Sequence, residues 1–280
     1  MLIVNLKTNL KLRVLLLIAL FIIPVITVYG HHHCGGKIIA VHDVNILSSS
    51  IAGAEEAQFI LDTLRFLVGP TPGNILAIQS AVPPLPGFGS SPDSLRDYST
   101  IIVNALANAG YTVDYTRDTT YTLTQLQNYD AVIVGVLFPE GTMIDASALT
   151  AYINDGGNIY VYGGVSVDSS ESATLNGLLT NFGLEFTNVY NMLIGDLPVV
   201  STHTIFNNVS SLEAGNGINL NDLDTNPFAS IIGYSSGQPI FAAYSPHCPT
   251  IQSTSIPTTS IYGILIAILI LFGITRTQIV

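Results

Sequence analysis

Residues 129–165, YDAVIVGVLFPEGTMIDASALTAYINDGGNIYVYGGV, constrain the fold more than any other part of the chain. Two continuous apolar segments, residues 131–136 and 158–162, are typical of strands buried on both faces. The amphipathic stretch between them ends at Gly156 and Gly157 and predicts a helix. A strand, a helix and a second strand in this order form a crossover unit, so the sequence predicts a parallel sheet covered by helices.

Strands and helices alternate along most of the remaining chain. Patterns typical of one or the other occur at residues 37–41, 53–68, 74–79, 95–109, 111–116 and 173–182. Residues 230–234 and 239–244 flank a Ser-Ser-Gly turn, which predicts a hairpin. The predicted fold class is α/β, a three-layer sandwich with a mainly parallel sheet and an antiparallel edge hairpin.

The 129–165 segment resembles the class I glutamine amidotransferase-like family, whose fold is flavodoxin-like. In that family a Tyr-Asp pair, an apolar strand, a loop, a helix, two glycines and a second apolar strand follow one another. In its catalytic members the second strand leads into a sharp elbow with a nucleophilic Cys. Here the elbow is Tyr162, Gly163, Gly164 and Val165. The resemblance therefore implies a non-catalytic relative, and we expect no cofactor.

The order of the segments differs from that of non-catalytic relatives, which end with a hairpin strand, a Gly-Gly strand closing on Asp, and a helix. Here the matching unit comes first, as residues 35–43 (GGKIIAVHD) and 57–67 (AQFILDTLRFL). The strand that should precede it, within residues 238–248, comes last. This order indicates a circular permutation with residues 70–73 as the new junction. The alternative is that residues 35–67 are an ordinary first unit of the sheet.

The amino-terminal end has the pattern of an export signal. Lys7, Lys11 and Arg13 precede a long apolar run. Residues 1–30 are therefore predicted to be a signal peptide, or an N-terminal anchor if they are not cleaved.

The other end predicts a transmembrane helix at residues 261–275, which are apolar, uncharged and followed by Arg276. A Ser/Thr/Pro linker, residues 249–260, separates this segment from the predicted α/β domain at 35–248. A buried core helix and a processed sorting tail are the alternatives.

Charge is distributed unevenly between the domain and the ends. The domain holds four basic and nineteen acidic residues, a formal charge of −15, whereas the other basic residues flank the apolar segments. This distribution favours a cell-membrane location with the main domain extracytoplasmic. It argues against nucleic acid as a partner, because an acidic surface repels phosphates.

Cys34 and Cys248 both belong to the part predicted to be exported, where disulfides persist. If residues 36–41 pair with 238–244 as the separated halves of a hairpin, the two cysteines reach the same end of the sheet, and we expect them to be bonded. Free thiols, or bonds to another chain, are the alternatives. Asn208 begins an N-glycosylation sequon, and the composition is similar to that of archaeal cell-surface proteins.

Ligands of open α/β sheets bind at the carboxyl ends of the strands. The loops expected there hold His42, Asp43 and Glu140, which would form the acid–base group if the chain were a hydrolase. A turn and capping pair is the alternative for His42 and Asp43. No Ser or Cys has the spacing of a nucleophile elbow.

The same loops supply the candidate ligand-binding residues Ser80, Gly163, Gly164 and Asp168. Asp168 and the nearby Glu171 are also typical of solvated charges at the start of a helix.

His33 is a candidate metal ligand. If cleavage follows Gly30, His33 becomes the third residue of the mature chain, and its imidazole, two amides and the free amine could bind Cu(II) or Ni(II). Terminal His tracts also bind metals without a biological role.

These patterns predict a membrane-anchored extracytoplasmic module that binds or assembles and does not catalyse a reaction. Its expected partners are the membrane and another cell-surface protein, a transporter protein or a glycan. A cell-surface hydrolase using His42, Asp43 and Glu140, and an accessory subunit of a membrane transporter, are the alternatives.

Overall fold

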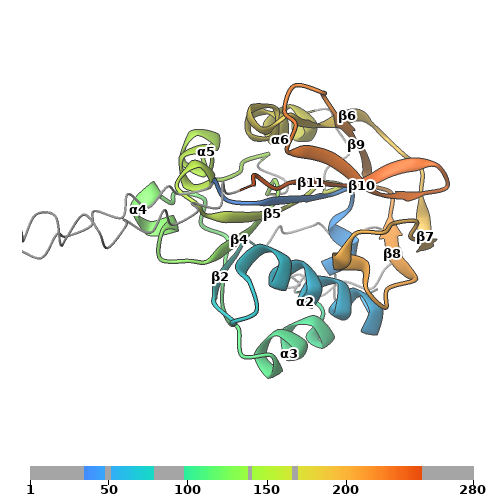
Figure 1. Ribbon diagram of the computed structural model, residues 1–280, viewed down its shortest axis with the longest axis horizontal. Coiled ribbons are helices and arrows are strands. Elements are labelled where there is room, and N and C mark those ends of the chain that lie inside the picture. The colour runs from blue at the N-terminus through green and yellow to red at the C-terminus, as the bar shows by residue number, and fades with distance from the viewer. Residues whose placement is uncertain (1–34, 48–51, 79–97, 138–140, 166–169, 248–280) are drawn as a thin grey trace, which may run out of the picture. The chain divides into compact units, whose positions relative to one another are not determined.

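The computed structural model describes residues 35–47, 52–78, 98–137, 141–165 and 170–247. Its main element is a seven-stranded sheet (Figure 1). In spatial order the strands are β10 (Ala229–Ser235), β11 (Gln238–Tyr244), β1 (Ile38–Val41), β5 (Asn158–Tyr162), β4 (Ala131–Val134), β2 (Asn74–Ile78) and β3 (Thr112–Thr116). The five strands β1, β5, β4, β2 and β3 run parallel to one another. Next to β1, the strands β11 and β10 form an antiparallel hairpin at one side of the sheet. The predicted α/β class, with its mainly parallel sheet and edge hairpin, is confirmed.

Helices cover both faces of the sheet (Figure 1). One face carries α2 (Ala54–Val68) and α3 (Thr100–Asn108), and the other carries α4 (Leu123–Leu126), α5 (Ala146–Asn154) and α6 (Ser170–Leu179). Short 3₁₀ turns are η1 (Val44–Leu47), η2 (Thr180–Phe182) and η3 (Thr204–Phe206). Local signals set several boundaries: Asp145 caps α5 by accepting from Ser147 N at 2.7 Å, and Ser99 caps α3.

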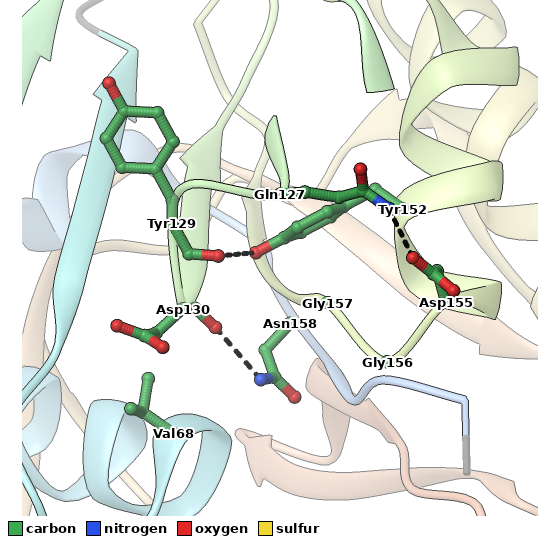
Figure 2. A pocket seen from close by; sticks show the side chains of 9 residues that line it. All are labelled: Val68, Gln127, Tyr129, Asp130, Tyr152, Asp155, Gly156, Gly157 and Asn158. Atoms are coloured by element: carbon green, nitrogen blue, oxygen red, sulfur yellow. Dashed lines mark hydrogen bonds between the residues drawn. The ribbon is translucent and has the colours of Figure 1, made fainter. Parts of the chain in front are cut away.

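The amino ends of β4 and β5 are fastened by polar contacts (Figure 2). The Tyr152 hydroxyl donates to Tyr129 O at 2.8 Å, and Asn158 Nδ2 donates to Asp130 O at 3.0 Å. Lys37 N donates to Asn158 Oδ1 at 3.0 Å, so β1 joins the same group. These bonds satisfy backbone groups where the ladder ends.

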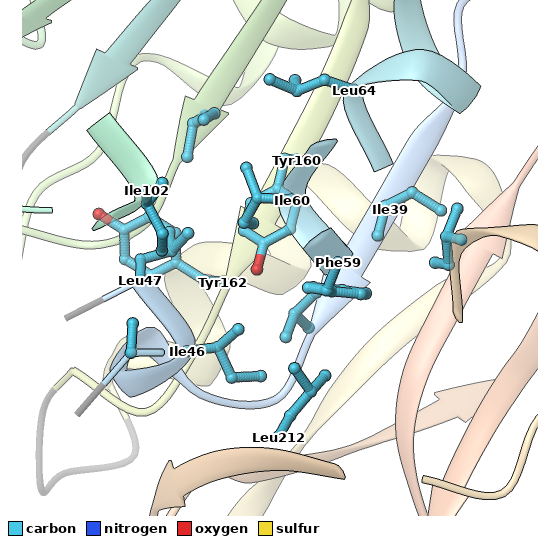
Figure 3. Packing of buried hydrophobic residues seen from close by; sticks show 14 of the residues in the cluster. Ile39, Ile46, Leu47, Phe59, Ile60, Leu64, Ile102, Tyr160, Tyr162 and Leu212 are labelled. Carbon is cyan, nitrogen blue, oxygen red and sulfur yellow. The ribbon is translucent and has the colours of Figure 1, made fainter. Parts of the chain in front are cut away.

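Side-chain alternation along the strands produces two apolar cores. In β1, Ile39 and Val41 face the core under α2 and α3, whereas Ile38 and Ala40 face the core under α5 and α6; all four have no exposed area. Figure 3 shows the first core, in which Phe59 of α2 packs against Tyr160 of β5 with ring centroids 6.5 Å apart. A strand buried on both faces must be apolar throughout, which is the pattern that the sequence shows.

Four short strands that the sequence patterns did not indicate lie between α6 and β10. They form two antiparallel pairs, β6 (Leu184–Tyr190) with β9 (Ile218–Asp222) and β7 (Ile194–Pro198) with β8 (Ser211–Gly215). The first turn of α2 holds β8, because Glu55 accepts from Ser211 N at 2.9 Å and Glu56 accepts from Glu213 N at 2.8 Å. Hydrogen bonds from backbone N–H groups lower the pKa of Glu55.

The expected pairing of the first and last strands of the domain is present. β1 and β11 are antiparallel, with Ile38 opposite Tyr244 and Val41 opposite Phe241. On its other side β1 is parallel to β5. The pairing agrees with the predicted permutation, and the permutation itself stays a prediction.

The predicted signal segment (1–30), linker (249–260) and transmembrane helix (261–275) lie outside the described residues. Within the described ranges, no helix combines the length and the hydrophobicity needed to cross a bilayer.

The described chain begins and ends near the amino end of β1, where Ile38 pairs with Tyr244. A Cβ placed on Gly35 would lie 3.6 Å from Tyr244 Oη and 3.7 Å from Pro246 Cγ. Cys34 and Cys248 lie outside the described residues, one position before Gly35 and two positions after Pro246 in the sequence.

We therefore expect a disulfide between Cys34 and Cys248, because their neighbours in the chain lie close together. Mass spectrometry of unreduced chymotryptic peptides should find the two segments linked. The bond would stabilise the fold by about 4 to 5 kcal/mol in the entropic model of a long closed loop. Alkylation of both cysteines without prior reduction would contradict the prediction.

Candidate functional site

The carboxyl edge of the parallel strands is where the sequence places a site. The structure brings together His42 and Asp43, which follow β1, and Gly163 and Gly164, which follow β5: Val44 N donates to Gly163 O at 2.8 Å. The other predicted residues at this edge, Ser80, Glu140 and Asp168, and the metal candidate His33, lie outside the described residues.

The connection between β8 and β9 encloses His42. The residue is 1% exposed, and Ile218 N donates to its backbone O at 2.9 Å. A Cβ placed on Gly217 would lie only 2.4 Å from His42 Nδ1, so the glycine backbone packs directly against the imidazole. The ring is therefore shielded from solvent by the chain's own backbone.

Hydrogen bonds around Asn191 define the protonation of His42. Leu193 N can only donate, and it donates to Asn191 Oδ1 at 3.0 Å. The amide nitrogen of Asn191 therefore faces Asn219 Oδ1 at 3.0 Å and His42 Nδ1 at 3.2 Å, and Nδ1 must accept. The proton then lies on Nε2, which has no hydrogen-bond partner among the described residues. Burial lowers the pKa of His42 to about 3, so the imidazole is neutral at physiological pH.

Asp43 is fully buried and binds two neighbouring segments. Its Oδ1 accepts from Asn45 N at 2.8 Å and from Asn45 Nδ2 at 2.9 Å. Its Oδ2 accepts from Gly215 N at the end of β8. The carboxylate thus fixes the turn after β1 and the end of β8 at once, which agrees with the turn and capping interpretation of this pair.

Gly163 and Gly164, which follow β5, pack tightly against the segment after β1. Gly163 N donates to Val41 O at 3.0 Å. Gly164 has a φ of +76°, and a Cβ there would lie 3.2 Å from Asp43 Cα and from Gly217 Cα. Both the backbone angle and the space therefore require glycine at Gly164. Ligand binding by these glycines stays a prediction.

Glu171 differs from its sequence-based interpretation as a solvated charge, since it is fully buried. Its Oε1 accepts from Val165 N at 2.9 Å, and its Oε2 accepts from the Tyr190 hydroxyl at 3.1 Å. The side chain ties the turn after β5 to β6. The local signal for this role is its position in the first turn of a helix, a few residues after two glycines.

Three amide side chains that sequence reasoning missed complete the edge. Asn219 Nδ2 donates to Gln238 Oε1 at 2.8 Å, and Gln238 Nε2 donates to Asn191 O at 3.3 Å. With the bond from Asn191 to Asn219 these contacts form a closed ring that joins β9, β11 and the segment before β7. No local sequence pattern predicts this ring of hydrogen bonds, because its three residues are far apart in the sequence.

An open pocket of about 340 Å³ lies at the opposite, amino edge of the sheet (Figure 2). It is lined by Val68, Gln127, Tyr129, Asp130, Tyr152, Asp155, Gly156, Gly157 and Asn158. The size is at the lower end of that of small-molecule sites. No candidate residue from the sequence lines it.

The glycosylation candidate Asn208 is exposed and has a φ of +61°. The hydroxyl and the N–H of Ser210, the third residue of the sequon, contact the carboxylate of Glu55 at 3.1 and 2.7 Å. Modification of Asn208 stays a prediction.

No family pattern, curated protein or solved structure matches this chain. The resemblance to the amidotransferase-like family therefore depends on the motif at residues 129–165 and on the order of the segments.

Replacing Gly164 by Ala should destabilise the fold more than replacing Gly237, which has a similar φ of +78° but no atom within 4 Å of an added Cβ. The Gly237→Ala change should cost about 1 kcal/mol through backbone strain alone. The Gly164→Ala change should cost roughly 1 to 2 kcal/mol more, because Asp43 and Gly217 must also move. Chemical denaturation measures both, and equal losses would argue against a tightly packed elbow.

His42 should make the free energy of unfolding depend on pH. The folded pKa is about 3 and the ordinary value is 6.5, so below pH 6.5 the unfolded chain binds a proton that the folded chain does not. The stability due to the neutral ring is complete above pH 6.5 and falls by up to about 1.4 kcal/mol per pH unit below it.

The matched variant is His42→Gln, which keeps an acceptor for Asn191 but does not titrate. Its stability deficit relative to the original chain should shrink as the pH falls from 7 to 4, while carboxylate effects are shared by both proteins. Denaturation curves with a constant difference over this range would contradict the assignment.

Proposed function

We propose that the chain is a membrane-anchored extracytoplasmic module that serves binding or assembly and does not catalyse a reaction. The observation that carries this proposal is the enclosure of His42 and Asp43 at the carboxyl edge. A general base must reach the proton that it removes, and a buried imidazole under Gly217 cannot do so. The pair instead fastens the connection between β8 and β9 to the sheet.

The same observation weighs against the hydrolase alternative. Two of its three residues, His42 and Asp43, are engaged in packing, and the turn after β5 supplies Gly163 and Gly164 in place of a nucleophile. A degenerate amidotransferase-like domain would have these properties.

Membrane anchoring is supported by the apolar segments at both ends and by the position of the ends of the domain. Gly35 and Pro246 lie close together, so segments on either side could reach one membrane without crossing the sheet. A cell-surface protein, a transporter protein and a glycan are the partner classes that fit an exported, acidic domain.

Protease accessibility tests the topology. Chymotrypsin added to intact cells should cleave the domain, because Tyr, Phe and Leu occur throughout it. Trypsin should leave residues 118–275 uncut, because no Lys or Arg lies between Arg117 and Arg276. The readout is mass spectrometry of released peptides, and full protection until the cells are lysed would overturn the extracytoplasmic assignment.

Catalysis is tested on the purified full chain with ester, amide and glycoside substrates. We expect no turnover. Hydrolysis that disappears in a folded His42→Gln variant would overturn the non-catalytic assignment.

A further inference from the structure

The seven-stranded sheet has two outer strands, β10 and β3, and the outer side of β10 is covered. Val200 N donates to Tyr234 O at 2.8 Å, and Tyr234 N donates to Val200 O at 3.1 Å. The Ser201 hydroxyl donates to Ile232 O. The register of β10 with β11 is also irregular between residues 231 and 234. Pairing and bulges of this kind protect the outer strands of natural sheets from further pairing.

The outer side of β3 has none of these features within the described part of the chain. β3 pairs with β2 in a regular parallel register, and no described strand lies on its other side. Its sequence, Thr-Val-Asp-Tyr-Thr, contains neither Pro nor Lys, which commonly protect outer strands. Thr, Val and Tyr all favour strands. Another strand can therefore be added to the sheet at β3.

The backbone groups of two residues in β3 point outward. Thr112 N donates to Gly73 O at 3.2 Å, so the first residue of β3 faces β2. Alternate residues of a parallel strand face the same neighbour, so the third and fifth residues also face β2. The second and fourth, Val113 and Tyr115, turn their N–H and C=O groups away from β2. These four groups have no hydrogen-bond partner among the described residues, and their spacing matches the bonds that an antiparallel strand makes.

The side chains of β3 differ between its two faces. Val113 packs against the apolar core under α2 and α3, and the Tyr115 ring lies 5.3 Å from the Tyr98 ring. Tyr115 is still 36% exposed, so a neighbouring side chain can cover it further. Asp114 lies on the opposite face, is exposed, and accepts from the Tyr129 hydroxyl at 2.9 Å. An added strand therefore meets an acidic side chain between two apolar ones.

A second copy of the chain fits this side poorly. If two β3 strands paired through all their outward groups, Val113 of each copy would lie opposite Tyr115 of the other, and each Asp114 would lie opposite its counterpart. Like charges directly opposite each other destabilise a sheet. The four basic and nineteen acidic residues of the domain add repulsion between copies. A strand with a basic residue between two apolar residues is complementary instead, because opposite charges then face each other at Asp114.

We propose that the outer side of β3 binds an extended segment of a partner protein by strand addition, and that this segment has Lys or Arg between two apolar residues. Main-chain hydrogen bonds to Val113 and Tyr115 supply the affinity, and the basic residue opposite Asp114 supplies the selectivity. This inference rests on the proposed binding role and narrows its partner class to a protein. It does not involve the membrane topology, so its failure would leave the extracytoplasmic assignment standing.

NMR on the full chain in detergent micelles tests the proposal, with the peptide acetyl-Ser-Thr-Val-Lys-Val-Thr-Ser-amide as the probe. We expect saturable shifts of the β3 amide signals. The amides of Val113 and Tyr115 should exchange with solvent more slowly in the complex, because their N–H groups become hydrogen-bonded. The amides of Thr112, Asp114 and Thr116 are internal references, because they face β2 and should change little.

Two N-methylated peptides distinguish strand addition from contact between side chains. Methyl groups on the backbone nitrogens of both valines remove the donors that face β3 and should weaken binding at least tenfold. The control carries its methyl group on the backbone nitrogen of the lysine, which points away from β3. Its binding should stay within about threefold of that of the original peptide, because no hydrogen bond to β3 is lost.

Variants of the chain test the same contacts. Val113→Pro removes one outward N–H but no hydrogen bond to β2, and it should weaken binding at least fivefold. Asp114→Asn keeps an acceptor for the Tyr129 hydroxyl and should weaken binding of the lysine peptide about two- to fivefold, but not that of a norleucine peptide. The control Asp196→Asn, on β7, changes the net charge equally and should leave binding within about twofold.

Absence of saturable binding would overturn the proposal, and so would equal binding of the peptide that is methylated on both valines. Unchanged solvent exchange of Val113 and Tyr115 in the complex would also overturn it, because the peptide would then bind elsewhere. Dimerisation of the chain in analytical ultracentrifugation that Val113→Pro abolishes would assign the outer side of β3 to a second copy in place of another protein.

Discussion

The two-sided pairing of β1 is the interaction on which the rest of the structure depends. This strand has no exposed residue, and it bonds to β5 on one side and β11 on the other, so it joins the parallel part of the sheet to the antiparallel hairpin. Both ends of β1 also pack closely against glycine backbone. Gly36 enters beside Gly157, where a Cβ would meet Gly157 O at 1.6 Å, and His42 leaves under Gly217. A side chain added at Gly36 or at Gly217 would therefore collide with backbone atoms next to an end of the central strand.

The two edges of the sheet differ in how closely the chain packs over them. Open α/β sheets normally bind ligands at the carboxyl edge. Here the β8–β9 connection occupies that region next to His42, and burial of Asp43 is compensated by hydrogen bonds from Asn45 and Gly215. The amino edge keeps an open pocket, which Asp130, Asp155 and Asn158 help to line. The region next to His42, where open α/β sheets commonly bind ligands, is therefore filled by the chain itself.

The sequence predicted those elements whose signal is local. The strands β4 and β5 are continuous apolar runs, α5 ends at two glycines, and the β10–β11 hairpin has a Ser-Ser-Gly turn, and all were expected. The strands β6 to β9 were missed because they are short and interrupted by polar residues, and their pairing depends on contacts with α2, α6 and β11. The start of α3 was expected at residue 95, whereas the helix begins at Thr100 after the cap at Ser99.

The sequence predicted where the residues of the candidate site lie but not that they are buried. The positions of His42, Asp43, Gly163 and Gly164 follow from strand ends, but their enclosure depends on Gly217, which is far away in the sequence. Burial of a titratable group is a property of its distant neighbours, so a single sequence cannot supply it. The amino-edge pocket was missed for a related reason, because helix ends and backbone groups form much of it.

The proximity of the two ends of the domain has a mechanical consequence. β1 and β11 are adjacent and antiparallel, and Ile38 is paired with Tyr244 next to both exits. A force that pulls the ends apart would load these hydrogen bonds one pair after another, beginning at Ile38, and would not shear them together. Opening one hydrogen-bonded pair at a time needs little force. Unfolding under a pulling force is governed by the unfolding rate of the protein. A covalent link between the segments that flank the two strands would carry the load in place of this first pair, and the sheet behind it would feel no tension.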